Sequence, residues 1–192
     1  MGRSPGSTPS SSATVALAGE GWTRVCGLSD LAARGDKTGG LRRVAEVNGR
    51  DLVVLHVPTP AGVPEGSTAA APAGGPGSLA SSDLLVAVDA SSTAFGYPLI
   101  DGPIVAVPSP TGSGGPLWAI ESPLDGSRYF LPGGQVQRWC PGDTVPRKAL
   151  AAMSDSGRAK PRDLPVHQCV AQEGGVWVRV AADAPAPGAL RA

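Results

Sequence analysis

The stretch PLWAIESPLDGSRYFLPGGQVQRWC, residues 116–140, decides the fold of this chain. Leu117, Ala119 and Glu121 alternate with Trp118, Ile120 and Ser122, which is the period of a β-strand. Asp125-Gly126 then turns the chain, and residues 128–131 are typical of a second short strand. Gly133-Gly134 makes a tight turn into a third strand. This order of strands and turns predicts a compact antiparallel meander.

The composition limits the classes of protein to consider. Glycine and proline are abundant, with 27 and 20 among 192 residues, and they gather in a few runs. Because this composition is partly that of disorder, the packed part should be smaller than the chain. The 16 basic and 16 acidic residues balance without a basic cluster, which argues against nucleic acid as a partner. No apolar run approaches the roughly 20 residues of a membrane span, so we expect a soluble or peripheral protein.

We expect one folded domain, residues 22–180, between two flexible ends. Residues 1–21 are rich in Ser, Thr, Ala, Pro and Gly, which suits either a flexible arm or the end of an organelle transit peptide. Residues 58–82 have a similar low-complexity composition and predict a mobile loop between two strands. The Ala/Pro-rich tail, residues 181–192, is expected to fray.

Several further stretches predict strands. The strongest hairpin signal is Asn48-Gly49 between two β-branched runs. The predicted strands outside the meander are residues 22–26, 41–47, 51–57, 84–89, 103–107, 164–170 and 176–180. We therefore predict an all-β antiparallel sandwich, with a base sheet from residues 22–57, 84–89 and 164–180 and a smaller lobe from residues 92–139. A turn with a short helical cap is expected at residues 27–31, and residues 147–153 suggest one or two turns of helix.

The central stretch resembles the second cluster-binding segment of Rieske 2Fe–2S domains, which has the pattern Cys-Pro-x-His-Gly-x-x-Phe-Asp-Leu-x-x-Gly-x-Val. Residues 122–136 keep this frame but have Ser122 at the cysteine position and Asp125 at the histidine position. The first segment of the family, Cys-x-His-x-Gly-x-x-Leu-x-x-Gly, fits residues 92–102, where Ser92 and Ala94 take the ligand positions. The resemblance implies a Rieske-like fold in which all four ligands are absent.

The missing ligands exclude the cofactor of the family. A Rieske centre needs two thiolates on one iron and two imidazoles on the other, and serine, alanine and aspartate do not replace these soft donors. We therefore expect no metal and no cofactor. Catalysis is not expected either, because Asp125 has no second carboxylate or histidine at a readable spacing and suits a turn before Gly126.

The cysteines and histidines do not supply these donors elsewhere. Cys26, Cys140 and Cys169 have unrelated spacings, which predicts buried or half-buried free thiols in a reducing compartment and no disulfide framework or zinc site. His56 is expected to be a satisfied strand histidine. His167 and Cys169 come nearest to a ligand pair, but in reversed order.

Two families keep this fold without the cluster. The small subunit of assimilatory nitrite reductase often has Ser-Pro-Leu in its second loop, as residues 122–124 do. The plastid Rieske-like protein associated with photosystem II keeps a proline and an acidic residue there, followed by Gly-x-x-x-x-Trp-x-Pro and an Ala-Leu stretch. Residues 134–141 and 147–150 resemble this second pattern, so the photosystem family is the first choice. The membrane helix that follows the domain in the plant protein has no counterpart here.

The resemblance implies a non-catalytic accessory subunit that docks on photosystem core or antenna subunits and stabilises their assembly or contacts. The setting would be the stromal side of a plastid thylakoid membrane. The alternative is the small subunit of a nitrite reductase-type enzyme. The residues expected to bind the partner are Phe95, Tyr97, Pro98, Leu124 and Arg128. Alternatively, Phe95 and Tyr97 fill the space that the cluster occupies in the family. Asp101, Asp125 and Arg128 are expected to rim this tip.

Overall fold

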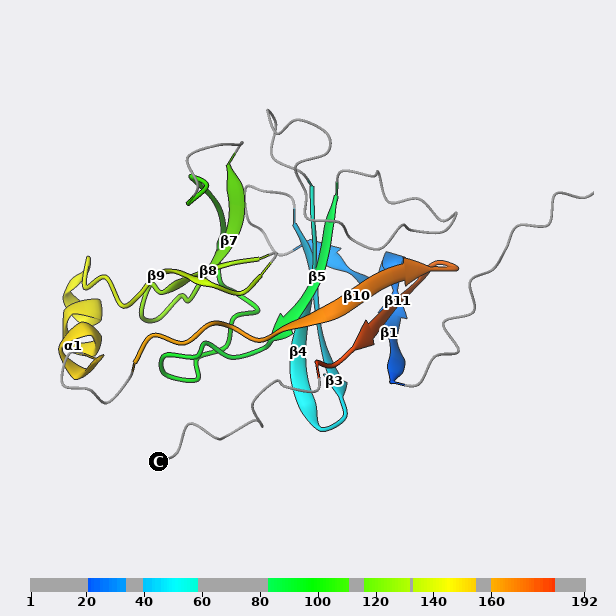
Figure 1. Cartoon of the computed structure of the whole chain (residues 1–192), viewed down its shortest axis with the longest axis horizontal. Helices are drawn as coiled ribbons and strands as arrows, with labels where there is room; N and C mark the ends of the chain where they lie inside the picture. The colour runs from blue at the N-terminus through cyan, green and yellow to red at the C-terminus, as the bar shows by residue number, and fades with distance from the viewer. Residues whose placement is uncertain are drawn as a thin grey trace, which may run out of the picture.

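The computed structural model describes residues 21–33, 40–58, 83–110, 116–131, 133–154 and 160–181. Apart from single end residues, the expected arm, inserted loop and tail lie outside these ranges. The described part consists mainly of antiparallel strands in two sheets, with one α-helix, α1, at Val145–Met153 (Figure 1). The prediction of an all-β fold is confirmed.

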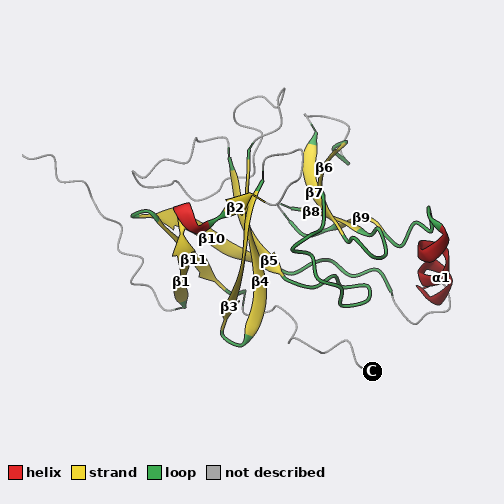
Figure 2. Cartoon of the chain, turned by 180° about the vertical axis from the view of Figure 1, so that it is seen from behind, coloured by secondary structure: helices red, strands yellow, loops and turns green. Residues whose placement is uncertain are grey.

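The larger sheet has seven strands in the order β1-β11-β10-β5-β4-β3-β2. Its strands are β1 (Trp22–Gly27), β2 (Ala32–Ala33), β3 (Leu41–Val47), β4 (Arg50–Val57), β5 (Leu84–Asp89), β10 (Val166–Gln172) and β11 (Gly175–Arg179). A 3-10 turn, Leu28–Asp30, follows β1. The smaller sheet, β6-β7-β8-β9, consists of β6 (Ile104–Val107), β7 (Leu117–Glu121), β8 (Arg128–Phe130) and β9 (Val136–Arg138). Figure 2 shows this smaller lobe beside the larger sheet, as predicted.

The Asn48-Gly49 turn fixes the register at the centre of the larger sheet. Both residues have positive φ angles, 54° and 73°, as a two-residue hairpin turn of the primed type requires. Val47 and Arg50 face each other across the turn, and the pairing continues to the far end of β3. The predicted hairpin is confirmed, with β4 beginning one residue earlier than expected.

Strand β4 is buried on both faces because a hydrophobic cluster lies on each side of it. Leu52 and Val54 belong to a cluster enclosed by the larger sheet, whose ends approach each other where β1 contacts β3. Val53 and Leu55, the alternate residues, belong to the cluster between the larger sheet and the smaller lobe. Strand β4 therefore contributes side chains to both hydrophobic clusters, one on each face of the larger sheet.

The cluster between the two sheets is mainly aliphatic. Its buried members are Val53, Leu55, Val57, Val86, Val88, Leu99, Ile104, Ile120, Tyr129, Leu131 and Leu164. Tyr129, from β8, is the largest fully buried side chain of the described residues. Trp118 and Trp139 pack against the edge of the cluster and are half-buried. The two sheets thus share one core, as a sandwich with a smaller lobe requires.

Helix α1 begins two residues earlier than the sequence suggested. Thr144 is extended, with φ −126° and ψ 162°, and Pro146 occupies the first turn, where its missing N–H is not needed. None of the residues of the helix is buried, and it lies at the far end of the smaller lobe from the larger sheet (Figure 1). In the ranges that the structure describes, no helix has the length and apolar character to cross a bilayer.

Candidate functional site

Two loops of the smaller lobe have the same backbone hydrogen bonds. In the first loop, residues 91–102, the N–H of Ser92 donates to the carbonyl oxygen of Tyr97 at 2.8 Å, and the N–H of Gly96 donates to that of Ser92 at 3.0 Å. In the second loop, residues 122–127, the N–H of Ser122 donates to the carbonyl oxygen of Ser127 at 2.8 Å. The N–H of Gly126 there donates to that of Ser122 at 3.0 Å. The two loops are therefore built on one repeated turn.

Each turn ends in a glycine with a left-handed backbone. The φ angle is 68° at Gly96 and 75° at Gly126, a region that other residues rarely adopt. A Cβ atom on Gly126 would also lie 2.5 Å from Nη1 of Arg147, which reaches over the second loop from α1. The serine and the glycine stand four residues apart in both loops, as the first ligand and the glycine do in the two Rieske patterns.

The side chains at the four ligand positions are engaged within their own loops or carry no donor. Ser92 is 1% exposed, and its Oγ accepts the N–H of Tyr97 at 3.2 Å. Ser122 donates its hydroxyl to Oδ2 of Asp125 at 2.8 Å, while Oδ1 of Asp125 accepts the N–H of Ser127 at 2.7 Å. Ser122 and Asp125 are both 0% exposed. Ala94 completes the set with a methyl group that cannot bind a metal.

A buried phenol joins the two loops. Oη of Tyr129 lies 3.1 Å from Oγ1 of Thr93 in the first loop, and Thr93 also donates to the carbonyl oxygen of Arg162 at 2.7 Å. Desolvation by burial raises the pKa of Tyr129 to about 12, and the negative charge of Asp125 acts in the same direction. The phenol therefore stays protonated at neutral pH and acts as a structural link.

An ion-pair network ties α1 and β9 to the base of the second loop. Glu121, at the end of β7, accepts from Nε of Arg128 at 2.6 Å and from Nη2 of Arg147 at 3.0 Å. Arg138 lies 3.6 Å from the same carboxylate and 3.3 Å from Asp143. Because Glu121 is buried, these three guanidinium groups hold its charge in a largely water-free place. The network fixes the second loop rather than forming an open site.

The predicted partner-binding residues lie in these two loops and on β8. Tyr97 is 41% exposed and Pro98 is exposed, whereas Phe95, Leu124 and Arg128 are half-buried. The position of Asp125 corrects one expectation. It was expected at the rim of the tip but is fully buried, because its carboxylate is needed to close the turn.

All three cysteines and both histidines of the chain lie in the described ranges, so every soft donor can be placed. Cys26 and Cys169 are on strands of the larger sheet, where burial raises both thiol pKa values, that of Cys169 to about 12. His56 contacts Asp83 at 3.1 Å, as expected of a satisfied strand histidine. His167 contacts Asp89 at 2.9 Å and accepts the N–H of Ala181 at 3.2 Å through Nδ1.

Cys140 is the one thiol beside the second loop. Its Sγ lies 3.6 Å from Oγ of Ser127, and its N–H donates to the same oxygen at 3.1 Å. No group of three or more His, Cys, Asp or Glu side chains in the described residues could hold a metal ion. A single thiol without an imidazole nearby does not make a cluster site.

Two arginine contacts of the site gave no signal in the sequence. Arg42 of β3 donates to the carbonyl oxygens of Ile100, at 3.0 Å, and of Gly102, and so holds the first loop against the larger sheet. Arg147 of α1 holds the second loop in a similar way. Both contacts join residues far apart in the chain, and no local pattern marks an arginine for such a role.

Comparison with known proteins gives weak structural likenesses. A protein assigned as the small subunit of an NADPH nitrite reductase is 13% identical, with a TM-score of 0.44, over 82% of this chain and 96% of that one. A protein from Mycobacterium tuberculosis assigned as the small subunit of an NADH-dependent nitrite reductase is 15% identical, with a TM-score of 0.45, over 83% of this chain and 96% of that one. No family model and no curated protein matches the chain. The comparisons therefore assign it to no family, and its function has to be argued from its own residues.

Proposed function

We propose that this chain is a non-catalytic accessory subunit with a cluster-less Rieske-like fold, which works by binding a larger protein. One observation carries the proposal. The positions of the four cluster ligands hold Ser92, Ala94, Ser122 and Asp125, and the three polar side chains among them are hydrogen-bonded inside the loops.

Electron transfer through a Rieske cluster finds no support in the placement of the soft donors. Cys26, Cys169 and the two histidines all lie on strands of the larger sheet. Each histidine contacts an aspartate. Only Cys140 stands near a former ligand loop. A fold that retains both loops but has lost their chemistry is suited to offering them as a protein-binding surface.

The first partner we propose is a photosystem core or antenna subunit at the thylakoid membrane of a plastid. It rests on the likeness of residues 134–141 and 147–150 to the plastid Rieske-like family. The second is the large subunit of a nitrite reductase-type enzyme. One observation favours it, the Ser-Pro-Leu at residues 122–124 that opens the second loop.

Affinity purification distinguishes these partners. The tagged full chain is expressed in its native cells, recovered separately from membrane and soluble extracts, and the co-purifying chains are identified by mass spectrometry. Photosystem subunits from the membrane extract are expected. A flavin- and sirohaem-bearing reductase from the soluble extract would replace the first partner by the second, and the absence of any stoichiometric partner in both extracts would contradict the proposal.

A matched pair of variants tests whether the tip takes part. Tyr97→Ser removes an exposed apolar side chain from the first loop, and Val44→Ser removes one of similar exposure, 46% against 41%, from β3 of the larger sheet. We expect reduced partner recovery with Tyr97→Ser and unchanged recovery with Val44→Ser. Equal recovery with both variants would place the binding surface away from Tyr97.

A further inference from the structure

Helix α1 is attached to the domain along one side, in part through polar contacts. Arg147 donates from Nη2 to Glu121 at 3.0 Å and from Nη1 to Asp143 at 3.2 Å. At the other end of the helix, Trp139 donates its indole N–H to Oγ of Ser154 at 2.7 Å. At about 3.6 residues per turn, Arg147 and Ser154 lie on the same side of the helix. These contacts fix which side faces outward.

The outward side of α1 is almost entirely apolar. It is formed by Val145, Lys148, Ala149, Ala152 and Met153, all of which are exposed. Val145 is 81% exposed and Met153 is 42% exposed, and they are two of the four large hydrophobic side chains exposed in the described residues. A surface helix normally turns its apolar stripe to the core and its polar residues to water. Leu150 and Ala151 follow this rule and are half-buried, but the apolar residues of the outward side do not, and an exposed apolar patch of this kind is typical of an interaction site.

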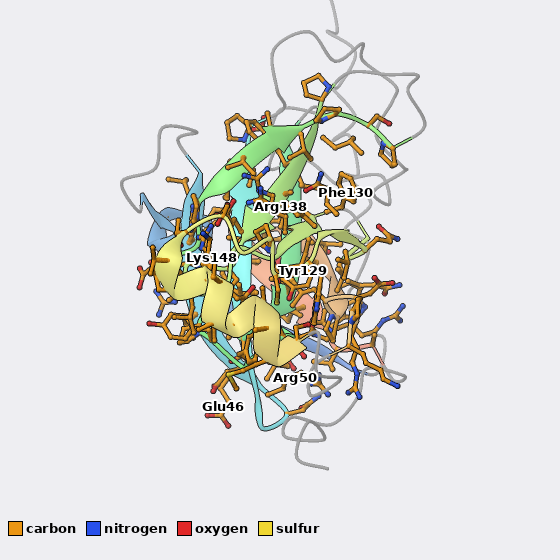
Figure 3. All side chains as sticks on the ribbon, turned by 90° about the vertical axis from the view of Figure 1, so that its left-hand side faces the viewer. Glu46, Arg50, Tyr129, Phe130, Arg138 and Lys148 are labelled. Atoms are coloured by element: carbon orange, nitrogen blue, oxygen red, sulfur yellow. The ribbon has the colours of Figure 1, made fainter. Side chains whose placement is uncertain are left out.

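The one charge on this face is Lys148, which stands on the helix at the front of Figure 3. No described residue forms an ion pair with it, whereas the arginines nearby share their charge with carboxylates. Among the described residues around the second loop and α1, Arg128, Arg138 and Arg147 form ion pairs with Glu121 or Asp143. Lys148 is the described cation of this region for which no carboxylate partner is found there.

We propose that this outward face of α1 (Val145, Lys148, Ala149, Ala152 and Met153) docks into an apolar groove of a partner protein that places an aspartate or glutamate opposite Lys148. The inference rests on the proposed function. It adds a second binding surface, outside the two loops, and states the chemistry of the partner that would bind there. Arg147 also donates to the carbonyl oxygen of Pro123, so the domain-facing side of α1 lies beside the second loop.

The charge on the face selects this occupant over two others. In a two-fold contact with a second copy, this face would meet the same face of the other copy, because an isologous interface uses one surface twice. The face has no carboxylate, so Lys148 would stay without a counter-charge. A lipid surface is favoured by several Lys or Arg residues beside bulky apolar groups. This face has one lysine and two alanines, whose small side chains allow the close approach that a protein groove makes.

Zero-length cross-linking tests the proposal directly. A water-soluble carbodiimide joins a lysine amine to a carboxylate that touches it, and the chain has only three lysines, Lys37, Lys148 and Lys160. The tagged full chain is cross-linked in native extract, and the linked peptides are sequenced. We expect a bond between Lys148 and an Asp or Glu of one co-purifying protein. Lys148→Arg should abolish this bond and leave co-purification intact, because it keeps the charge but not the amine.

A second pair of variants measures the apolar part of the contact. Val145→Asp introduces a carboxylate at the helix N-terminus, where the backbone tolerates it, and Val44→Asp makes the same change on β3. The first should weaken partner binding by about tenfold or more, as the loss of an interface anchor does, and the second should leave it unchanged. Circular dichroism and thermal unfolding of both variants check that each remains folded.

The contrary outcomes separate the two proposals. If the wild-type chain recovers a partner but Val145→Asp binds it equally well and no bond forms at Lys148, the docking face is refuted and the accessory function stands. A bond from Lys148 only to a second copy, or binding to anionic vesicles that Val145→Asp abolishes, would refute the proposed occupant. If the wild-type chain recovers no partner, the proposed function fails and the inference with it.

Discussion

Part of the loss of stability at alkaline pH should come from one buried phenol, which a substitution can separate from the buried thiols. Tyr129 is fully buried, and desolvation raises its pKa from 10.0 to about 12. The folded state favours the protonated phenol, so this stabilisation is complete below about pH 10 and is lost as the pH rises towards 12. Two pKa units at about 1.4 kcal/mol each correspond to a loss of about 2.7 kcal/mol in the free energy of unfolding.

The assay compares the wild-type chain with Tyr129→Phe in chemical denaturation between about pH 8 and pH 12. At pH 8 the variant should be less stable by about 1 kcal/mol, the usual value of one buried hydrogen bond. Its stability should then fall less steeply, so that the two curves converge and cross towards pH 12. Since the chain has two tyrosines, Tyr97→Phe isolates the absorbance titration of Tyr129. Parallel stability curves, or ionisation of Tyr129 near pH 10, would refute the reasoning.

Two further substitutions test the packing of the smaller lobe. Gly134→Ala should cost about 3 kcal/mol in chemical denaturation, because φ is 73° and the new Cβ would run into the carbonyl oxygen of Leu164. Gly49→Ala has the same φ but open space and should cost only about 1 kcal/mol, so an equal effect would contradict the role of the clash. Glu121→Gln should cost about 2 kcal/mol, because its half-buried arginine partners lose the counter-charge of a buried carboxylate. The control Glu46→Gln, on the exposed side of β3, should stay within about 0.5 kcal/mol, and a similar loss there would argue against the network.

The sequence predicts the strands of this fold because their signals are local. The turn at Asn48-Gly49 fixes its hairpin through two residues that tolerate positive φ. The last two predicted strands, residues 164–170 and 176–180, need a turn between them, and the chain turns there at Glu173 and Gly174, whose φ angles are 52° and 70°. Element ends were less certain, because they depend on contacts elsewhere in the domain. Strand β10, for example, begins at Val166 rather than at Leu164, whose N–H donates to the carbonyl oxygen of Gly134.

The candidate site was predictable only where a residue acts on its own loop. The spacing of Ser122, Asp125 and Gly126 predicts a turn, and the structure has a turn at these residues. The sequence could not show that Asp125 is buried rather than at the rim, since burial depends on what packs over the loop. Nor could it show that Arg147 reaches Glu121 across 26 positions of the chain. Long-range ion pairs need the tertiary fold before their partners can be named.

The exposed face of α1 could not be predicted from the sequence either, because it depends on how the helix packs on the domain. The stretch RKALAAM, residues 147–153, predicts a short helix from its composition. Its apolar residues would ordinarily be assigned to the core on that pattern alone. Only the placement of Arg147 and Ser154 against the domain reveals that Val145 and Ala149 point away from it.

The measurement that tests the account most directly is the iron and acid-labile sulfide content of the full chain, purified anaerobically from its native cells. The absence of a thiolate–imidazole set at Ser92, Ala94, Ser122 and Asp125 predicts a colourless protein with neither element in stoichiometric amount. Two iron atoms and two sulfides for each chain would contradict the account, because they would show that this fold carries electrons and does not serve only to bind another protein.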